Sequence, residues 1–90
     1  EDIVQVGSRS WRVDGWVHLE EVVEKLNHHL PVEEFDSLAG FVFDLFGRIP
    51  EKNESIDTEQ AIFTVKEMEA HRILSVEIER KQEYPIEEAD

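Results

Sequence analysis

Hydrophobic positions change their spacing along the chain, and the first changes mark strands and a helix. Residues 10–14 alternate apolar and polar side chains, which is typical of a half-exposed strand. The apolar run at residues 3–6 predicts a second strand, or one continuous strand with an irregularity at Gly7-Ser8. After the Asp14-Gly15 turn signal, residues 18–29 predict a helix whose apolar stripe is Leu19, Val22, Val23 and Leu26.

A second helix is expected between Pro31 and Gly47. Asp36 or Ser37 can cap its start, and Gly47 suits the left-handed position just past its end. Its interior Gly40 costs about 1 kcal/mol relative to alanine, which predicts a compensating close contact with a strand or with the first helix. The helix is apolar nearly all round, so it is expected to be buried on more than one side; the apolar positions are Phe35, Leu38, Phe41, Val42, Phe43, Leu45 and Phe46.

The pattern in the last third of the chain predicts three strands. Residues 55–57 predict a weak strand, residues 61–68 a better one, and residues 72–80 the clearest alternation. Residues 69–71 would join the last two as a hairpin, although the turn lacks glycine or asparagine. In the last strand the side chains expected to face the core are Leu74, Val76 and Ile78, and those expected to face outward are Ser75, Glu77 and Glu79.

The predicted order is therefore β-β-α-α-β-β-β. An α+β fold, a small antiparallel sheet with two helices packed on one face, fits this order. Residues 1–82 are expected to form one domain. Residues 83–90 are expected to be an acidic tail without fixed structure.

The composition excludes several kinds of site and partner. The 90 residues include no cysteine, so disulfides and thiolate metal sites are excluded. Aspartate and glutamate number 22 against 9 lysines and arginines, giving a net charge of -13, which disfavours nucleic acid and anionic lipid surfaces as partners. No apolar run approaches the ~20 residues of a membrane span, so this fragment is not expected to insert in a membrane.

Residues arranged for catalysis are not visible. The serines sit in no nucleophile-elbow pattern, and the four glycines, at positions 7, 15, 40 and 47, make no phosphate-binding loop. Glu20 and Glu24 share a helix face but have no positioned partner for acid–base work. The sequence predicts no catalytic residues.

Histidines and carboxylates offer only weak candidates for a metal site. His28 and His29 are adjacent, so on a helix their side chains point about 100° apart and cannot chelate one ion together. The best oxygen-ligand clusters lack calcium-loop spacing and are more simply solvated acidic surfaces; they are Glu33, Glu34 and Asp36, and Glu87, Glu88 and Asp90. No metal site is predicted.

Trp11 and Trp16 flank the turn between the first strands and the first helix. Two interpretations are open for them. Exposed, they would mark a contact surface, since tryptophan is enriched in binding hot spots. Buried, they would be large core residues, and Trp11 shares a strand face with Val13.

A set of motifs in a fixed order carries a family resemblance from about Ser8 to Arg80. The chain resembles the CorC/HlyC-type transporter-associated domain, which follows a pair of CBS domains in magnesium and cobalt efflux proteins and hemolysin-like membrane proteins. Two departures lie at turns, where this chain has Asn53-Glu54 and Ala70-His71 instead of the usual glycine-containing pairs. The motifs are Val13-Asp14-Gly15, the Leu19–Leu26 helix, Leu30-Pro31, Ser37-Leu38-Ala39-Gly40, Gly47-Arg48-Ile49-Pro50, Phe63-Thr64-Val65 and Arg72-Ile73.

The resemblance implies a fold similar to the small lobe of certain FAD-binding enzymes and no established catalytic activity. It implies a regulatory module of an ion transporter on the cytoplasmic side of the cell membrane. Its partners would be the CBS domains and membrane domain of the same protein, or a second copy in a homodimer. The contact residues we predict are Trp16, Arg48 and Arg72.

Two alternatives stay open at this point. One is a domain that binds an adenine or flavin (FAD) nucleotide, which requires a concave pocket near the start of the second helix and the sheet. The other is a divalent cation sensor that uses surface carboxylates. No cofactor is assigned on the sequence alone.

Overall fold

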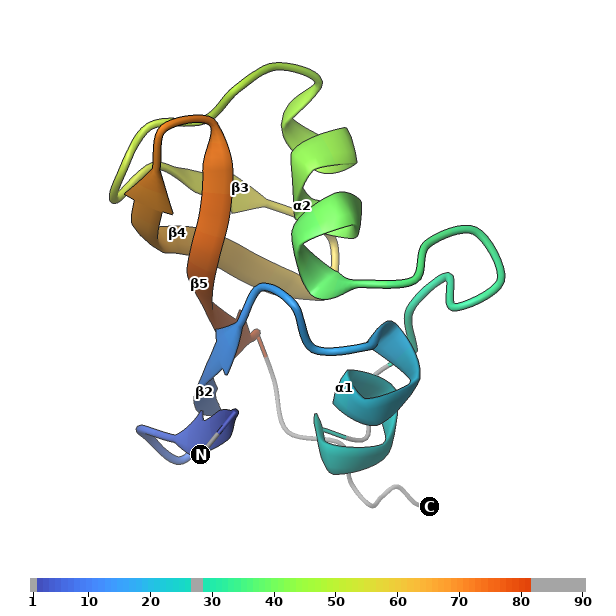
Figure 1. Ribbon diagram of the computed structural model, residues 1–90. Helices are drawn as coiled ribbons and strands as arrows, with labels where there is room; N and C mark the ends of the chain where they lie inside the picture. The colour runs from blue at the N-terminus through green and yellow to red at the C-terminus, as the bar shows by residue number, and fades with distance from the viewer. Residues whose placement is uncertain (1, 27–28, 82–90) are drawn as a thin grey trace, which may run out of the picture.

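A five-stranded antiparallel sheet with both helices on one face forms the frame of the molecule (Figure 1). This is a computed structural model, which describes residues 2–26 and 29–81. The element order and the α+β fold class are as the sequence predicts. The elements are β1 (Ile3–Gln5), β2 (Ser10–Asp14), α1 (Leu19–Leu26), α2 (Leu38–Phe46), β3 (Ser55–Asp57), β4 (Ala61–Glu69) and β5 (Arg72–Arg80).

The strands lie in the order β1-β2-β5-β4-β3, and every neighbouring pair is antiparallel. The edge strands β1 and β3 are only three residues long, so the sheet offers short edges for pairing with another chain. Between sheet and helices lies one apolar core. Its fully buried members are Val13, Val17, Leu19, Val22, Leu26, Leu38, Val42, Ala61, Phe63, Val65, Val76 and Ile78.

An irregularity in the β4–β5 pairing changes which side chains of β5 face the core. Val65 pairs with Val76 and Met68 pairs with Ile73, but between them Glu67 pairs with Ser75, one residue out of that register. The shift moves the alternation by one residue, because a strand's side chains alternate with period two. Ile73 is therefore buried and Leu74 only half-buried, so the expectation that Leu74 faces the core is wrong, as is the outward placement of Ser75, which is buried.

Both predicted ends of α2 are confirmed. Ser37 is the N-cap, and its hydroxyl accepts a hydrogen bond from the Gly40 amide at 3.2 Å. Gly47 lies in the left-handed region with φ 70°, and its N–H donates to the Phe43 carbonyl. Burial of this helix is less complete than predicted, because Phe43 remains 36% exposed on its outer face.

The close contact expected at Gly40 is at Gly15 instead. Gly40 is exposed, and a Cβ added there would meet only the Ser37 hydroxyl, at 3.5 Å. A Cβ added at Gly15 would overlap the Ile73 carbonyl oxygen and lie 3.1 Å from the Cβ of Ala39. The Asp14-Gly15 turn therefore passes tightly between β5 and the start of α2.

Trp11 belongs to the core side of the sheet. It is half-buried against the core, and the Arg80 guanidinium lies 5.1 Å from the centre of its ring. The same guanidinium donates to the Leu26 carbonyl, the last residue of α1, where a cation also complements the helix dipole. Helix α1 thus ends earlier than the predicted range of 18–29. Asn27, His28 and the acidic tail at 83–90 lie outside the described residues.

Candidate functional site

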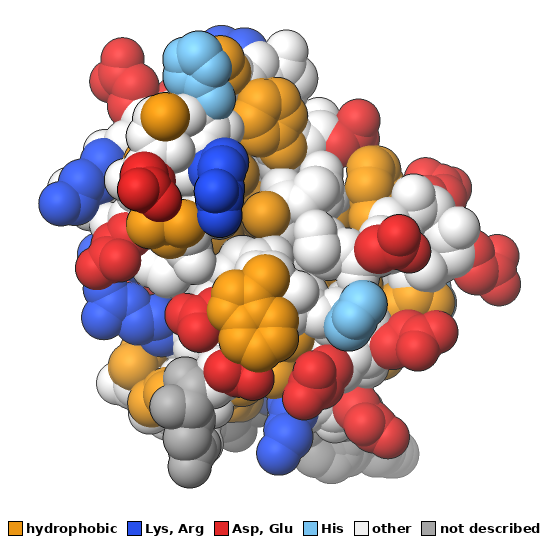
Figure 2. Space-filling view, viewed as in Figure 1, with side chains coloured by type: hydrophobic (Ala, Val, Ile, Leu, Met, Phe, Trp, Pro, Cys, Tyr) orange, Lys and Arg blue, Asp and Glu red, His pale blue; other side chains and the backbone are white. Residues whose placement is uncertain are grey.

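A groove of about 310 Å³ opens between the β2–α1 loop, the first turns of α2 and the β4–β5 hairpin. We call it the Trp16 groove. Figure 2 shows this face: acidic side chains gather over α1 and the segment before α2, while hydrophobic and basic side chains, with some acidic ones among them, lie over α2 and the hairpin. The residues that line the groove are Gly15, Trp16, Ser37, Ala39, Gly40, Phe43, His71, Arg72 and Ile73.

Trp16 is held on a loop whose backbone is bonded on both sides. The Gly15 amide donates to the Leu74 carbonyl at 2.8 Å, and the Gly15 carbonyl accepts from Ala39 at 2.8 Å. The Val17 carbonyl accepts from Leu38 at 2.9 Å. The loop is thus tied to β5 and to the N-terminus of α2, while the Trp16 side chain between these anchors is 63% exposed.

The floor of the groove is apolar because α2 has small residues where it faces Trp16. Ala39 and Gly40 leave a hollow, and Phe43 lies one turn farther along the same helix. Trp16 and Phe43 are both among the exposed large hydrophobic side chains of the described chain. Two exposed aromatic rings beside a small-residue hollow are typical of a surface that receives another apolar group.

The charge of the groove differs from that of the rest of the protein. None of its nine lining residues is acidic, although 22 of the 90 residues of the chain are aspartate or glutamate. His71 and Arg72 form its rim, both are exposed, and Arg72 makes no ion pair with any described residue. An anionic group of a partner would therefore meet a locally favourable potential here.

The backbone amides at the start of α2 already donate hydrogen bonds within the protein, so they are not free to bind a phosphate. The amides of Leu38, Ala39 and Gly40 donate to the Val17 carbonyl, the Gly15 carbonyl and the Ser37 hydroxyl. A phosphate at a helix N-terminus is normally held by such amides when they are free. The pocket that the nucleotide alternative requires is present, but its phosphate-binding donors are already used.

Two of the three predicted contact residues, Trp16 and Arg72, come together in the groove, and the third does not. Arg48 lies at the other end of α2, where its guanidinium pairs with both carboxylate oxygens of Glu54 and donates to the Ile49 carbonyl. The bond from Arg48 lowers the pKa of the Glu54 carboxyl, and the same pairing raises the pKa of Arg48. Arg48 thus closes the turn between α2 and β3, and a contact role for it stays a prediction.

Sequence reasoning missed Phe43, His71 and the small-residue floor as parts of one surface. Phe43 was read as core because the whole helix is apolar. The sequence did contain a sign of this surface. A helix packed on a single sheet face buries only part of its circumference, and this helix has more apolar residues than one buried stripe needs.

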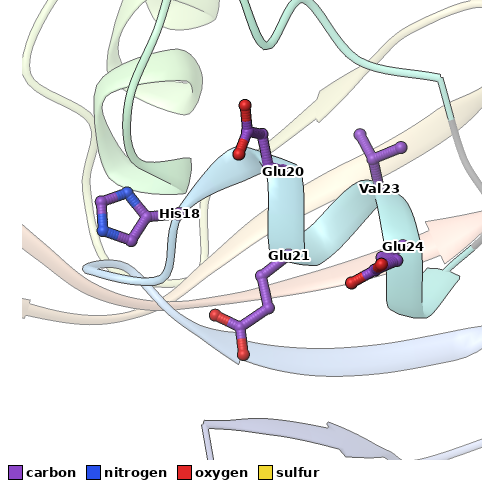
Figure 3. A pocket seen from close by; sticks show the side chains of 5 residues that line it. All are labelled: His18, Glu20, Glu21, Val23 and Glu24. Carbon is purple, nitrogen blue, oxygen red and sulfur yellow. The ribbon is translucent and has the colours of Figure 1, made fainter.

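A larger hollow of about 410 Å³ lies along α1, but its carboxylates do not converge (Figure 3). The side chains of Glu20 and Glu21 point in opposite directions, and Val23 completes the lining with His18 and Glu24. Among residues 2–26 and 29–81, no three histidines or carboxylates are grouped so that they could hold a metal ion, which includes Glu33, Glu34 and Asp36. Glu87, Glu88 and Asp90 lie outside the described part.

Across the described ranges, neither helix has the length and apolar character needed to cross a membrane.

Comparison with known proteins identifies the domain. The sequence pattern of the CorC_HlyC family, described as the transporter associated domain, matches residues 4–82. The chain belongs to this family. Its fold class and motif order are therefore those that the resemblance implied.

Curated relatives of this CorC_HlyC domain are much longer than the chain. The magnesium and cobalt efflux protein CorC of Escherichia coli strain K12 is 29% identical over 84 residues, which cover 93% of this chain. The matched region is only 29% of that relative, so the chain spans less than a third of its length.

Solved CorC_HlyC domains share the fold over nearly their whole length. The domain from Nitrosomonas europaea superimposes with a TM-score of 0.80 at 28% identity, covering 90% of this chain and 98% of that one. A domain from a Xylella fastidiosa hemolysin, in complex with Mg²⁺ and Mn²⁺, gives a TM-score of 0.76 at 26% identity. The match covers 91% of this chain and 100% of that one.

Proposed function

We propose that this chain is a non-catalytic regulatory module of a CorC-type ion transporter, on the cytoplasmic side of the membrane. Family membership and the relatives named as magnesium and cobalt efflux proteins support this proposal. Because the chain corresponds to less than a third of such a relative, the ion pathway would lie in other domains. The module would act by docking onto its own longer protein, either on the CBS domains and membrane domain or on a second copy.

The Trp16 groove is the observation that carries the docking proposal. Trp16 is 63% exposed, which places a large apolar surface in water, yet its loop is held in this position by hydrogen bonds to β5 and α2. Fixing the side chain's anchor points before binding reduces the entropy lost on docking. Tryptophan and arginine are also the residue types most enriched in interface hot spots, and both line this groove.

Docking becomes regulation when the docking free energy differs between two states of the transporter. A neighbour that senses a ligand could then shift the population of the docked module, and the module could in turn bias the ion pathway. Nothing in this scheme requires the module to bind ions or to perform chemistry.

The two alternatives receive less support from the geometry. A nucleotide in the Trp16 groove would find the amides of α2 occupied, which leaves only His71 and Arg72 for its phosphates. For a cation sensor, the Xylella hemolysin domain was solved in complex with Mg²⁺ and Mn²⁺. The described residues of this chain contain no cluster that could hold such an ion, so we propose no cation site.

An efflux assay on the full-length transporter tests the proposal. Trp16→Glu should change the transport rate or its response to effectors, because it puts a charge into the docking contact. Ile49→Glu is the matched control, since Ile49 is also exposed, at 43%, but does not line the groove. Unchanged transport in Trp16→Glu, with the protein folded and present at normal levels, would refute a regulatory role for this surface.

A further inference from the structure

We propose that the Trp16 groove receives residues 83–88 of a second copy of this chain. The sequence of this segment is Glu-Tyr-Pro-Ile-Glu-Glu. The inference rests on the proposed function, because it names the occupant of the surface through which the module would dock.

The groove defines the chemistry of its occupant. Its floor, formed by Trp16, Phe43 and the hollow at Ala39 and Gly40, fits one or two apolar side chains. Its rim carries Arg72 beside His71, and no acidic residue lines it. A suitable segment therefore has an apolar centre with carboxylates directly beside it, so that burial and ion pairing occur together.

Residues 83–88 have this composition. Tyr84, Pro85 and Ile86 form an apolar centre, and Glu83 and Glu87 flank it on both sides. Tyrosine combines a large apolar ring with a polar tip, which suits a partly open groove. The residue before a proline favours an extended backbone, so Tyr84 would lose less conformational freedom on binding than a residue that does not precede a proline.

The acidic–apolar stretch before α2 is already used within the fold. Phe35 follows Glu33 and Glu34, but its ring packs edge-on against Phe41 with 5.7 Å between the ring centres. Moving it into the groove of another molecule would remove that contact. The segment at 83–88 follows the family match, which ends at residue 82.

Chain length favours a second copy over the same copy. Ile73 lines the groove, and Lys81 lies eight residues along the strand direction, about 26 Å away at the rise of a β-strand. Ile86 is five residues beyond Lys81 and can span at most about 18 Å even when fully extended. The apolar centre therefore cannot reach its own groove, but it can reach that of a neighbour.

A different hollow competes for the tail within one copy. It is about 220 Å³ in volume and includes Gln60, whose carbonyl accepts a hydrogen bond from the Lys81 amide at 3.0 Å. Its lining includes Glu59 and lacks arginine and lysine, so it offers the flanking glutamates no strong cationic partner; the lining is His29, Leu30, Pro31, Phe41, Leu45, Thr58, Glu59, Gln60 and Phe63. Binding here is an outcome that the experiment must distinguish.

The test is an NMR titration of the ¹⁵N-labelled 90-residue chain with an unlabelled peptide of residues 82–90. We expect saturable shifts at the Trp16 indole and at the amides of Gly40, His71 and Ile73. Arg72→Glu should weaken binding roughly tenfold, because it replaces an attraction by a repulsion. Arg12→Glu, an exposed arginine on β2 outside the groove, is the matched control and should leave binding unchanged. A peptide with Tyr84→Ala should bind more weakly.

Three results would overturn the inference. They are no saturable shift up to about 1 mM peptide, shifts centred on Leu30 and Leu45 in the competing hollow, or equal weakening by Arg72→Glu and Arg12→Glu. None of them would refute the proposed function, because that proposal does not depend on which segment occupies the groove. Loss of transport regulation in Trp16→Glu is measured separately and does not depend on the peptide.

Discussion

Gly15 and Gly40 show how single residues set the geometry of the groove. Gly15 lets the β2–α1 loop pass against the Ile73 carbonyl, which fixes where Trp16 emerges. At Gly40 an added Cβ would meet only the Ser37 hydroxyl, at an ordinary contact distance of 3.5 Å, and the missing side chain leaves the hollow that Trp16 borders. One glycine is therefore needed for the fold, and the other shapes the surface.

These two glycines should respond in opposite directions to substitution by alanine. Gly15→Ala should lower the free energy of unfolding by about 2–3 kcal/mol, because the new methyl group meets backbone that cannot yield easily. Gly40→Ala should raise it by about 1 kcal/mol, since alanine is the better helix former and the site has room. Urea denaturation measures both. Destabilisation by Gly40→Ala would show that the helix packs more tightly there than described.

Glu54 gives the stability of the α2–β3 turn a defined pH dependence. Its folded pKa is lowered, chiefly by the hydrogen bond from Arg48, so the ionised form stabilises the folded state. The contribution is present above the unfolded pKa, about 4.3 for glutamate, and is lost as the pH falls through the folded pKa.

The expected result is a stability gap between the wild type and Glu54→Gln that is constant near neutral pH and closes below about pH 4. Urea denaturation at a series of pH values measures this gap. Glu59→Gln serves as control, because Glu59 makes no ion pair with any residue in the described ranges. A gap that persists unchanged at acid pH would mean that Glu54 acts by packing and not through its charge.

At the scale of elements, the sequence predicted what depends on local chemistry. The helix cap at Ser37 and the left-handed Gly47 follow from short-range preferences and are confirmed. The β4–β5 hairpin, which was predicted from its two flanking strands, is also confirmed. The hairpin forms even though Ala70 must adopt φ 55°, a conformation that costs most residues energy. The register shift between β4 and β5 could not be predicted, because two strands only reveal it when they pair.

The same limit explains what the sequence missed in the site. Trp16 and Arg72 were predicted as contact residues, but their neighbourhood depends on how a loop, a helix and a hairpin meet in space. Phe43 looked like core because no sequence pattern states which side of an all-apolar helix faces the sheet. Arg48 was predicted from its charge in an acidic chain, and only the structure shows its pairing with Glu54.

The N-cap of α2 should contribute both to stability and to the shape of the groove. Ser37→Ala removes the acceptor for the Gly40 amide and should cost about 1 kcal/mol in thermal or urea unfolding. Ser8→Ala, in an exposed loop, should change stability by no more than about 0.5 kcal/mol. Equal effects of the two substitutions would show that the cap contributes nothing.

At the scale of the whole molecule, charge and surface point to one docking face. A body with a net charge of -13 repels a second acidic body at most orientations, so an acid-free groove with a basic rim favours one particular contact. The opposite face of the sheet carries charged and polar side chains, among them Arg12 and Glu77, and is suited to water. We therefore expect one face of the domain to be covered in the assembled transporter and the other to remain open.

Cysteine accessibility tests this central claim most directly, because the chain contains no cysteine of its own. His71→Cys places a thiol on the rim of the Trp16 groove, and Ile49→Cys places one on an exposed site outside it. Maleimide labelling is compared between the isolated chain and the full-length transporter with its other cysteines replaced. We expect position 71 to be labelled much more slowly in the transporter, and position 49 to be labelled equally in both. Equal labelling of position 71 in the two contexts would contradict this claim.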